Sequence, residues 1–152
     1  MRKLTIALIS FALTASSAQA VQLPSQVDLK AAYCISVKQS QIAPFNEFSG
    51  IPNLTDDLKQ MATASAEKLN SDLRHLQRYL LPRLEYLDSS AIEAAMQQAK
   101  EDLPLASLDS NACLFLCSRD GKQGVGCLTN CSEKSGVLTR IKTCNDLSFL
   151  PF

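Results

Sequence analysis

Residues 113–131 read CLFLCSRDGKQGVGCLTNC and repeat one cysteine spacing: Cys113-x3-Cys117, nine residues, then Cys127-x3-Cys131. Residues four apart lie on the same face of an α-helix, so each pair predicts a helix with both sulfurs on one side. Two such helices packed antiparallel would face each other across Cys113–Cys131 and Cys117–Cys127. The stretch therefore predicts a disulfide-linked helical hairpin near the C-terminus.

The other two cysteines, Cys34 and Cys144, stand near the two ends of the chain behind its first twenty residues. An even number of cysteines is typical of structural disulfides in an oxidising compartment. We expect a third disulfide, Cys34–Cys144, between the first and the last helix. Six cysteines allow many pairings, and the sequence alone does not choose among them.

The twin Cys-x3-Cys spacing resembles that of coiled-coil-helix-coiled-coil-helix proteins and of the small mitochondrial translocase chaperones. The resemblance covers 19 of the 152 residues, from Cys113 to Cys131, and implies a hairpin geometry rather than an activity. Two other uses of the four cysteines stay open. A zinc site would need thiolates, usually spaced Cys-x2-Cys. Thiol redox catalysis usually needs Cys-x-x-Cys at the start of a helix, a motif that this chain lacks.

The first twenty residues have the pattern of an export signal. Arg2 and Lys3 are basic, residues 4–13 form an apolar run, and Ala18-Gln19-Ala20 fits a cleavage site. We expect cleavage near Ala20, which leaves residues 21–152 as one periplasmic or secreted domain. No later apolar run reaches the length of a membrane span, so we expect no transmembrane segment in the mature chain.

The charge balance argues against nucleic acid as a partner. Without Arg2 and Lys3, 13 basic residues face 15 acidic ones, and the expected mature net charge is −2. A nucleic-acid binder usually carries a basic field. No cofactor motif is present, and the sequence leaves the oligomeric state and the identity of a protein partner open.

The hydrophobic spacing predicts an all-α fold of four to six helices, because no alternating strand pattern occurs. The first helix is expected over 25–41, with Ser25 and Asp28 as a capping box, and a break over 44–52 lets Phe45 and Phe48 reach the core from a loop.

The strongest periodic pattern begins at Asn53, the expected N-cap, and runs to residue 87. Pro82 should kink or stop this helix near Leu81. A further helix is expected over 90–102, capped by Ser90 with Glu93 and ended by Pro104.

The cysteine hairpin is expected to follow in two short helices, the first capped by Asp109 or Ser110. The glycine-rich residues 121–126 should form the turn between them. We interpret those glycines as a turn and not as a phosphate loop, because the Gly-Lys-Ser/Thr ending is missing. One or two helical turns are expected over 137–144.

Three groups of residues are candidates for chemistry. His75, the single histidine, would need a nucleophile and a carboxylate around it to act as a catalytic base. Arg74, Arg78 and Arg83 form a possible patch for an anionic partner. The pairs Asp56–Asp57 and Glu101–Asp102 are the candidates for general acid–base catalysis by two carboxylates.

Each candidate group also has a plain structural interpretation as a solvated helix face or a helix end, which the sequence favours. We assign no catalytic, metal or cofactor residue. We expect a non-catalytic binding, inhibitor or accessory protein. The alternatives are a small secreted hydrolase acting on lipid or cell wall, and a metal-binding or thiol-redox module built on the twin cysteines.

Overall fold

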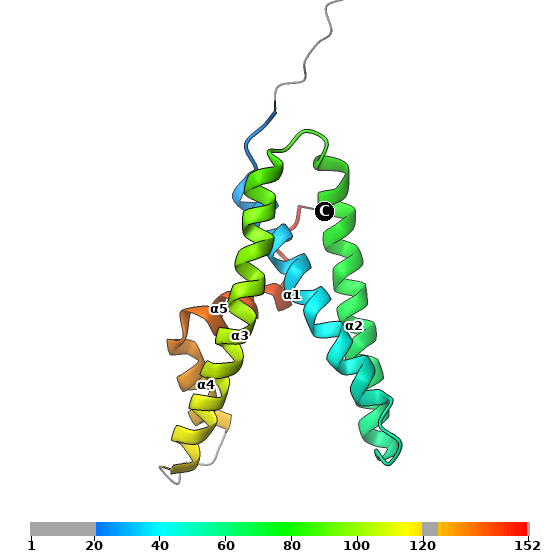
Figure 1. Cartoon of the computed structure of the whole chain (residues 1–152), viewed down its shortest axis with the longest axis vertical. Helices are drawn as coiled ribbons and strands as arrows, with labels where there is room; N and C mark the ends of the chain where they lie inside the picture. The colour runs from blue at the N-terminus through cyan, green and yellow to red at the C-terminus, as the bar shows by residue number, and fades with distance from the viewer. Residues whose placement is uncertain (1–20, 120–124, 152) are drawn as a thin grey trace, which may run out of the picture.

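The computed structural model describes residues 21–119 and 125–151, and the chain is drawn in Figure 1. The helices are α1 (Gln26–Ser49), α2 (Asp56–Leu80), α3 (Ser89–Arg119), α4 (Val125–Lys134) and α5 (Gly136–Lys142), with short 3-10 turns η1 (Leu81–Arg83) and η2 (Thr143–Asn145). The described residues contain no strand beyond an isolated bridge between Gln22 and Leu87. The predicted all-α class is confirmed, and the expected export signal lies outside the described residues.

The helices form a V with two arms (Figure 1). One arm is the hairpin of α1 and α2, and the other is the second half of α3 with α4 beside it. The two arms meet where the first half of α1 lies between α2 and α3. There the residues after α5 return across α1, and this meeting point holds the core.

The middle of α1 is buried on all sides. Every residue from Ala31 to Lys38 is buried, because α2, α3 and η2 all pack around it. Leu76 and Leu80 of α2 and Ala99 of α3 complete this core. A helix that is apolar all round belongs in an interior. The run from residue 31 to 37 is therefore the centre of the domain, not one face of a surface helix.

All three expected disulfides are present. Cys113–Cys131 and Cys117–Cys127 join α3 to α4 with Cα–Cα distances of 5.6 and 5.9 Å. Cys34–Cys144 joins α1 to η2 across a sequence separation of 110. Its two sulfur-bearing residues are fully buried in the core, whereas the hairpin pairs lie along the second arm.

Two predicted helix ends at prolines are wrong. α1 continues through Pro44 to Ser49, and α3 continues through Pro104 to Arg119. An internal proline costs a helix about 3 kcal/mol. Tertiary contacts offset that cost, because α2 runs beside α1 and the disulfides to α4 hold α3 beyond Pro104. The expected separate short helix capped by Asp109 or Ser110 is thus the second half of α3.

The aromatic residues expected to fill the core from a loop do not do so. Phe45 and Phe48 lie on the continuous helix α1, with 37% and 41% of their surface exposed. They belong to the outer part of the first arm, because α1 extends past the core instead of ending before Pro44.

The helix starts were predicted with mixed success. Ser25 and Asp28 form the expected capping box, with the Asp28 amide donating to the Ser25 hydroxyl at 3.2 Å. Asn53 does not cap α2, which begins at Asp56 after Thr55. The predicted capping box of Ser90 with Glu93 is wrong: α3 already begins at Ser89, and the Asp88 carboxylate accepts the Ser90 amide at 2.9 Å. The predicted stop near Leu81 is confirmed, since α2 ends at Leu80.

The end of the chain follows the predicted outline. The second cysteine helix is α4, which includes residues 125 and 126 of the expected turn, and the other residues of that turn, 121–124, lie outside the described residues. The last expected helical turns are α5 and η2. None of the helices in the described part of the chain has the length and apolar character needed to cross a membrane.

Candidate functional site

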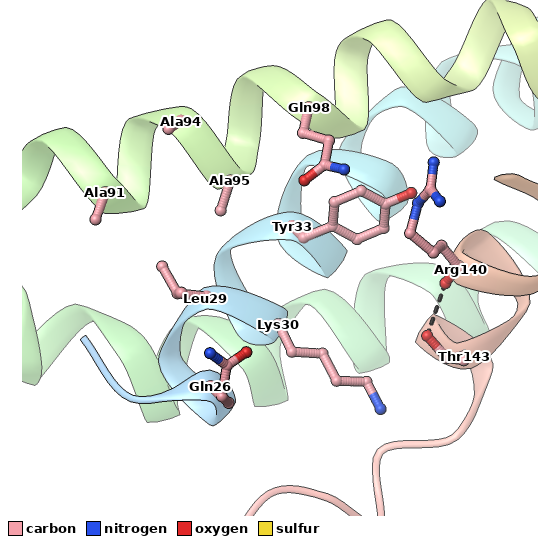
Figure 2. Close-up of a pocket in the computed structure, with 10 residues that line it drawn as sticks. All are labelled: Gln26, Leu29, Lys30, Tyr33, Ala91, Ala94, Ala95, Gln98, Arg140 and Thr143. Carbon is pink, nitrogen blue, oxygen red and sulfur yellow. Dashed lines mark hydrogen bonds between the residues drawn. The ribbon is translucent and has the colours of Figure 1, made fainter. Parts of the chain in front are cut away.

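A groove with a cavity volume of about 510 Å³ lies between the first halves of α1 and α3 (Figure 2). α5 and η2 close one end of it. Small-molecule sites in proteins typically have volumes of roughly 300–1,000 Å³. The lining residues come from three places: Gln26, Leu29, Lys30 and Tyr33 of α1, Ala91, Ala94, Ala95 and Gln98 of α3, and Arg140 and Thr143 at the closed end.

Alanines create the space in the groove. The α3 residues that line it have the spacing i, i+3, i+4, i+7, which places them on one helix face, and three of the four are alanine. Figure 2 shows Ala91 and Ala95 projecting from α3 toward Leu29 of α1. The methyl groups of these alanines do not fill the space between α1 and α3. The groove between the two helices therefore stays open, and its floor is apolar.

The closed end is built on a buried carboxylate. Asp102 of α3 has only 7% of its side chain exposed, and Arg140 binds both of its oxygens through Nε at 2.9 Å and Nη2 at 3.0 Å. The Tyr33 hydroxyl donates to Asp102 Oδ2 at 2.8 Å. The hydrogen bond from Arg140 holds the pKa of Asp102 below its usual value, although burial opposes this. Asp102 is therefore ionised and fully engaged.

The proton donors at this end are fixed in their protonated forms. Burial raises the pKa of Tyr33 to about 12, and the hydrogen bond to Asp102 adds to this effect. The same bond to Asp102 raises the pKa of Arg140. A guanidinium has five N–H donors, and Asp102 takes two of those of Arg140. In Figure 2, Gln98 and Arg140 lie on either side of the hydroxyl end of Tyr33.

Lys30 adds a second positive charge to the groove. Its ammonium lies 4.0 Å from the centre of the Phe149 ring, a cation–π contact with the residues that follow η2. Lys30 also acts on Asp146, whose pKa is lowered mainly by hydrogen bonds from Ser148 and in small part by the charge of Lys30. None of the described residues that line the groove carries a carboxylate. The groove thus combines an apolar floor with the cationic side chain of Lys30 and with the guanidinium of Arg140, whose charge is paired with Asp102.

The predicted arginine patch is assembled only in part. Arg78 and Arg83 line a cavity of about 640 Å³ together with His75, Tyr79, Pro82 and Pro151, and Arg74 is not among the lining residues. Arg83 donates from Nε to the buried Asp28 at 2.8 Å, so its charge is already compensated. Whether this patch binds an anion stays a prediction.

The predicted carboxylate pairs do not form acid–base sites. Asp56 and Asp57 are exposed in the first turn of α2. Glu101 is exposed and accepts from Gln97 at 3.1 Å, whereas its neighbour Asp102 is buried. The two members of the second pair therefore occupy different environments and do not face a shared substrate position.

Sequence patterns missed the buried charges that hold the helices together. Lys38 has 1% of its side chain exposed, and its ammonium donates to Asp72 at 2.9 Å and to Asn145 at 3.1 Å. The one available signal was its position directly after the mostly apolar residues 31–37, which are buried on all sides in the structure.

The sequence identifies Asp28 only as part of a capping box. Its carboxylate also accepts hydrogen bonds from the Tyr79 hydroxyl at 2.9 Å and from Arg83 Nε. Burial opposes its ionisation, but the hydrogen bonds from Ser25, Tyr79 and Arg83 outweigh that effect and lower its pKa. Asp28 thus links the first turn of α1 to the end of α2.

All six cysteines are in disulfides, so no thiolate remains at the twin Cys-x3-Cys pairs in this state. Within residues 21–119 and 125–151, no three histidine, cysteine or acidic side chains gather as a metal site would require.

No family model, curated protein or solved structure matches this chain.

Proposed function

We propose that this chain is an exported, non-catalytic binding protein whose α1–α3 groove holds a small amphipathic anion. The observation that supports this most directly is the makeup of the groove: alanines and Leu29 form its floor, Lys30 supplies a positive charge, and Arg140, paired with Asp102, supplies N–H donors. An apolar ligand body would cover the floor, where burial stabilises by roughly 25 cal/mol per Å².

The anionic end of the ligand would lie at Arg140. Two of its donors hold Asp102, which fixes the plane of the guanidinium, and the guanidinium also interacts with the Tyr33 side chain; the remaining N–H groups would bind the ligand. A carboxylate or sulfonate suits these donors, because charge-assisted hydrogen bonds to a guanidinium are stronger than neutral ones. Lys30 would add a further attraction from the α1 side.

Binding is favoured over catalysis because the polar groups of the groove are engaged in other bonds. Tyr33, with its pKa near 12, is a neutral donor to Asp102 and not a base. The Thr143 hydroxyl donates to the Arg140 carbonyl at 2.7 Å. Export is supported by the signal-like first twenty residues and by three disulfides, which are typical of oxidising compartments.

Calorimetry and NMR with dodecanoate test this function on the disulfide-bonded protein. We expect saturable binding, with shifts confined to the groove residues. Dodecyltrimethylammonium, which has the same tail and the opposite charge, should bind at least about tenfold more weakly, since 1.4 kcal/mol is a factor of ten.

Two variants test whether dodecanoate binds in the α1–α3 groove. Ala94→Phe should fill the groove from its exposed α3 side, and Lys30→Met should remove the charge while keeping an apolar stem; both should weaken dodecanoate binding. Lys100→Met, an exposed lysine on the same helix outside the groove, is the matched control. Unchanged affinity in both groove variants, or equal binding of the cationic detergent, would overturn the proposal. Hydrolysis of an ester probe that these variants abolish would instead support the hydrolase alternative.

A further inference from the structure

A second cavity, of about 440 Å³, lies between α1 and α2, the two helices of the first arm (Figure 1). Its volume is within the range of roughly 300–1,000 Å³ that is typical of small-molecule sites. Residues of α1 and α2 line it, together with Asn145 of η2, and none of them lines the α1–α3 groove. We refer to this space as the α1–α2 cavity.

The wall of the α1–α2 cavity holds a buried ion pair. The side chains of Lys38 and Asp72 are 1% and 15% exposed, and the Lys38 ammonium donates to Asp72 Oδ2 at 2.9 Å and to Asn145 Oδ1 at 3.1 Å. All three residues line the cavity. Among the described residues, these bonds use two of the three Lys38 N–H donors and one of the two Asp72 oxygens. The wall therefore offers a donor and an acceptor of opposite charge.

A third charge and an apolar side complete the wall. Lys68 lies four residues before Asp72 on α2, so the two side chains share one helix face. Within residues 21–119 and 125–151, Lys68 has no ion-pair partner. Phe45 of α1 and Leu69 of α2 supply the apolar side. The cavity thus combines two ammonium groups, one carboxylate and an apolar surface.

We propose that the α1–α2 cavity binds a zwitterionic α-amino acid with an apolar side chain. The ligand ammonium would donate to Asp72, and the ligand carboxylate would accept from Lys38 and Lys68. Such charge-assisted hydrogen bonds are stronger than neutral ones. The ligand side chain would cover Phe45 and Leu69, where burial of apolar surface is favourable.

The charges on the wall favour a zwitterion over an ion of one sign. An anion would gain the two lysines, but it would bring a second negative charge next to Asp72. A cation would gain Asp72, but it would face two ammonium groups. Placing like charges together in a desolvated contact is costly. A ligand that carries both charges gives each charged group of the wall an opposite partner.

Three ligands with one aromatic ring test this charge requirement. L-phenylalanine carries both charges, 3-phenylpropionate lacks the ammonium, and phenethylamine lacks the carboxylate. Calorimetry on the disulfide-bonded protein should show saturable binding of L-phenylalanine. Each of the other two should bind at least about tenfold more weakly. Changing the ligand leaves the Lys38–Asp72 pair intact, whereas removing one partner of a buried ion pair strongly destabilises a fold.

Two variants at exposed positions test whether the amino acid binds in the α1–α2 cavity. Lys68→Met removes one of the two positive charges, and Phe45→Ala removes part of the apolar side. Each should weaken L-phenylalanine binding about threefold or more, as expected for partly exposed contacts. Lys100→Met and Phe48→Ala are the matched controls, because both residues are exposed and lie outside the cavity. Both controls should bind like the wild type.

The outcomes separate this site from the α1–α3 groove. Because the two share no residue, dodecanoate should not displace L-phenylalanine. Displacement by dodecanoate would overturn the proposal, as would a lack of saturable L-phenylalanine binding up to roughly 10 mM. Equal affinity for 3-phenylpropionate would show that the ammonium is not recognised. Unchanged affinity in both cavity variants, or equal weakening in the two controls, would show that the amino acid binds elsewhere.

Discussion

The Tyr33 hydroxyl donates to Asp102 Oδ2 at 2.8 Å, across 69 residues of sequence and between two buried side chains on different helices. Arg140 binds the same carboxylate from α5. One aspartate therefore joins α1, α3 and α5 at the closed end of the groove.

Removing the tyrosine hydroxyl should lower stability without unfolding the domain. Tyr33→Phe deletes one buried hydrogen bond to an ionised carboxylate, and we expect a loss of roughly 1.5–3 kcal/mol in the free energy of unfolding. Urea unfolding followed by circular dichroism measures it. Tyr86→Phe, a tyrosine with 41% exposure, is the control and should stay within about 0.5 kcal/mol of the wild type. Equal losses in both variants would contradict the role of the Tyr33–Asp102 bond.

Acid should weaken the fold through Asp28 and Asp102. In the folded protein the pKa of each lies below the ordinary value of 3.8. For Asp28, the hydrogen bonds that its carboxylate accepts outweigh the opposing effect of burial. For Asp102, the hydrogen bond from Arg140 is the main cause. A carboxylate whose pKa is lower in the folded protein than in the unfolded chain stabilises the fold. This stabilisation is fully present above the pKa of the unfolded chain, and it is lost as the pH falls through the pKa of the folded protein. We therefore expect the free energy of unfolding to be level above about pH 5 and to fall below about pH 4.

The free energy of unfolding should fall less steeply with decreasing pH when one of these carboxylates is removed. Asp102→Asn should be less stable than the wild type at pH 7 and should lose less stability between pH 5 and pH 2, about the range in which the carboxylate titrates. Adding Asp28→Asn should flatten the profile further. Urea unfolding at several pH values measures the slope. A slope in the double variant equal to that of the wild type would show that other groups govern acid unfolding.

The long disulfide should stabilise the fold more than the short one. In the chain-entropy model, a loop of 110 residues gives about 5 kcal/mol and a loop of 10 residues about 3 kcal/mol. Replacing both cysteines of each bond by alanine and comparing thermal unfolding tests the order. The Cys34 and Cys144 pair should show the greater loss, because its removal also leaves space in the core. A greater loss from the Cys117 and Cys127 pair would contradict it.

Mild reduction should open the disulfides in a fixed order. Cys34 and Cys144 are fully buried, whereas Cys127 and Cys131 are only half-buried on α4. Access of the attacking thiolate limits exchange, so the two bonds of the second arm should be reduced first. Alkylation and peptide mapping at increasing times would follow this. In denaturant the difference should disappear, and early loss of Cys34–Cys144 in the native protein would be the contrary result.

Local chemistry determined much of the helical outline. The capping box at Ser25, the stop before Pro82 and the facing cysteines at positions four apart follow from short-range rules that hold wherever a helix forms. The disulfide pairing expected from the twin spacing also proved right, because two facing helices leave few ways to join four sulfurs.

The same local rules failed at Pro44 and Pro104. Each proline weakens a helix locally, but contacts with residues far along the chain decide whether the helix ends there. The disulfides to α4 hold α3 beyond Pro104, and α2 packs along α1. Rules based on neighbouring residues do not include the energies of these long-range contacts.

The sequence by itself determined the helical class and the cysteine hairpin, because each depends on separations of a few residues along one helix. Only the tertiary structure decided that Asp102 meets Tyr33 and Arg140, that Lys38 meets Asp72 and Asn145, and that three alanines leave a groove beside Lys30. Those side chains come together through the crossing of α1 with α2 and α3. That crossing depends on the summed packing of the whole core and not on any short segment.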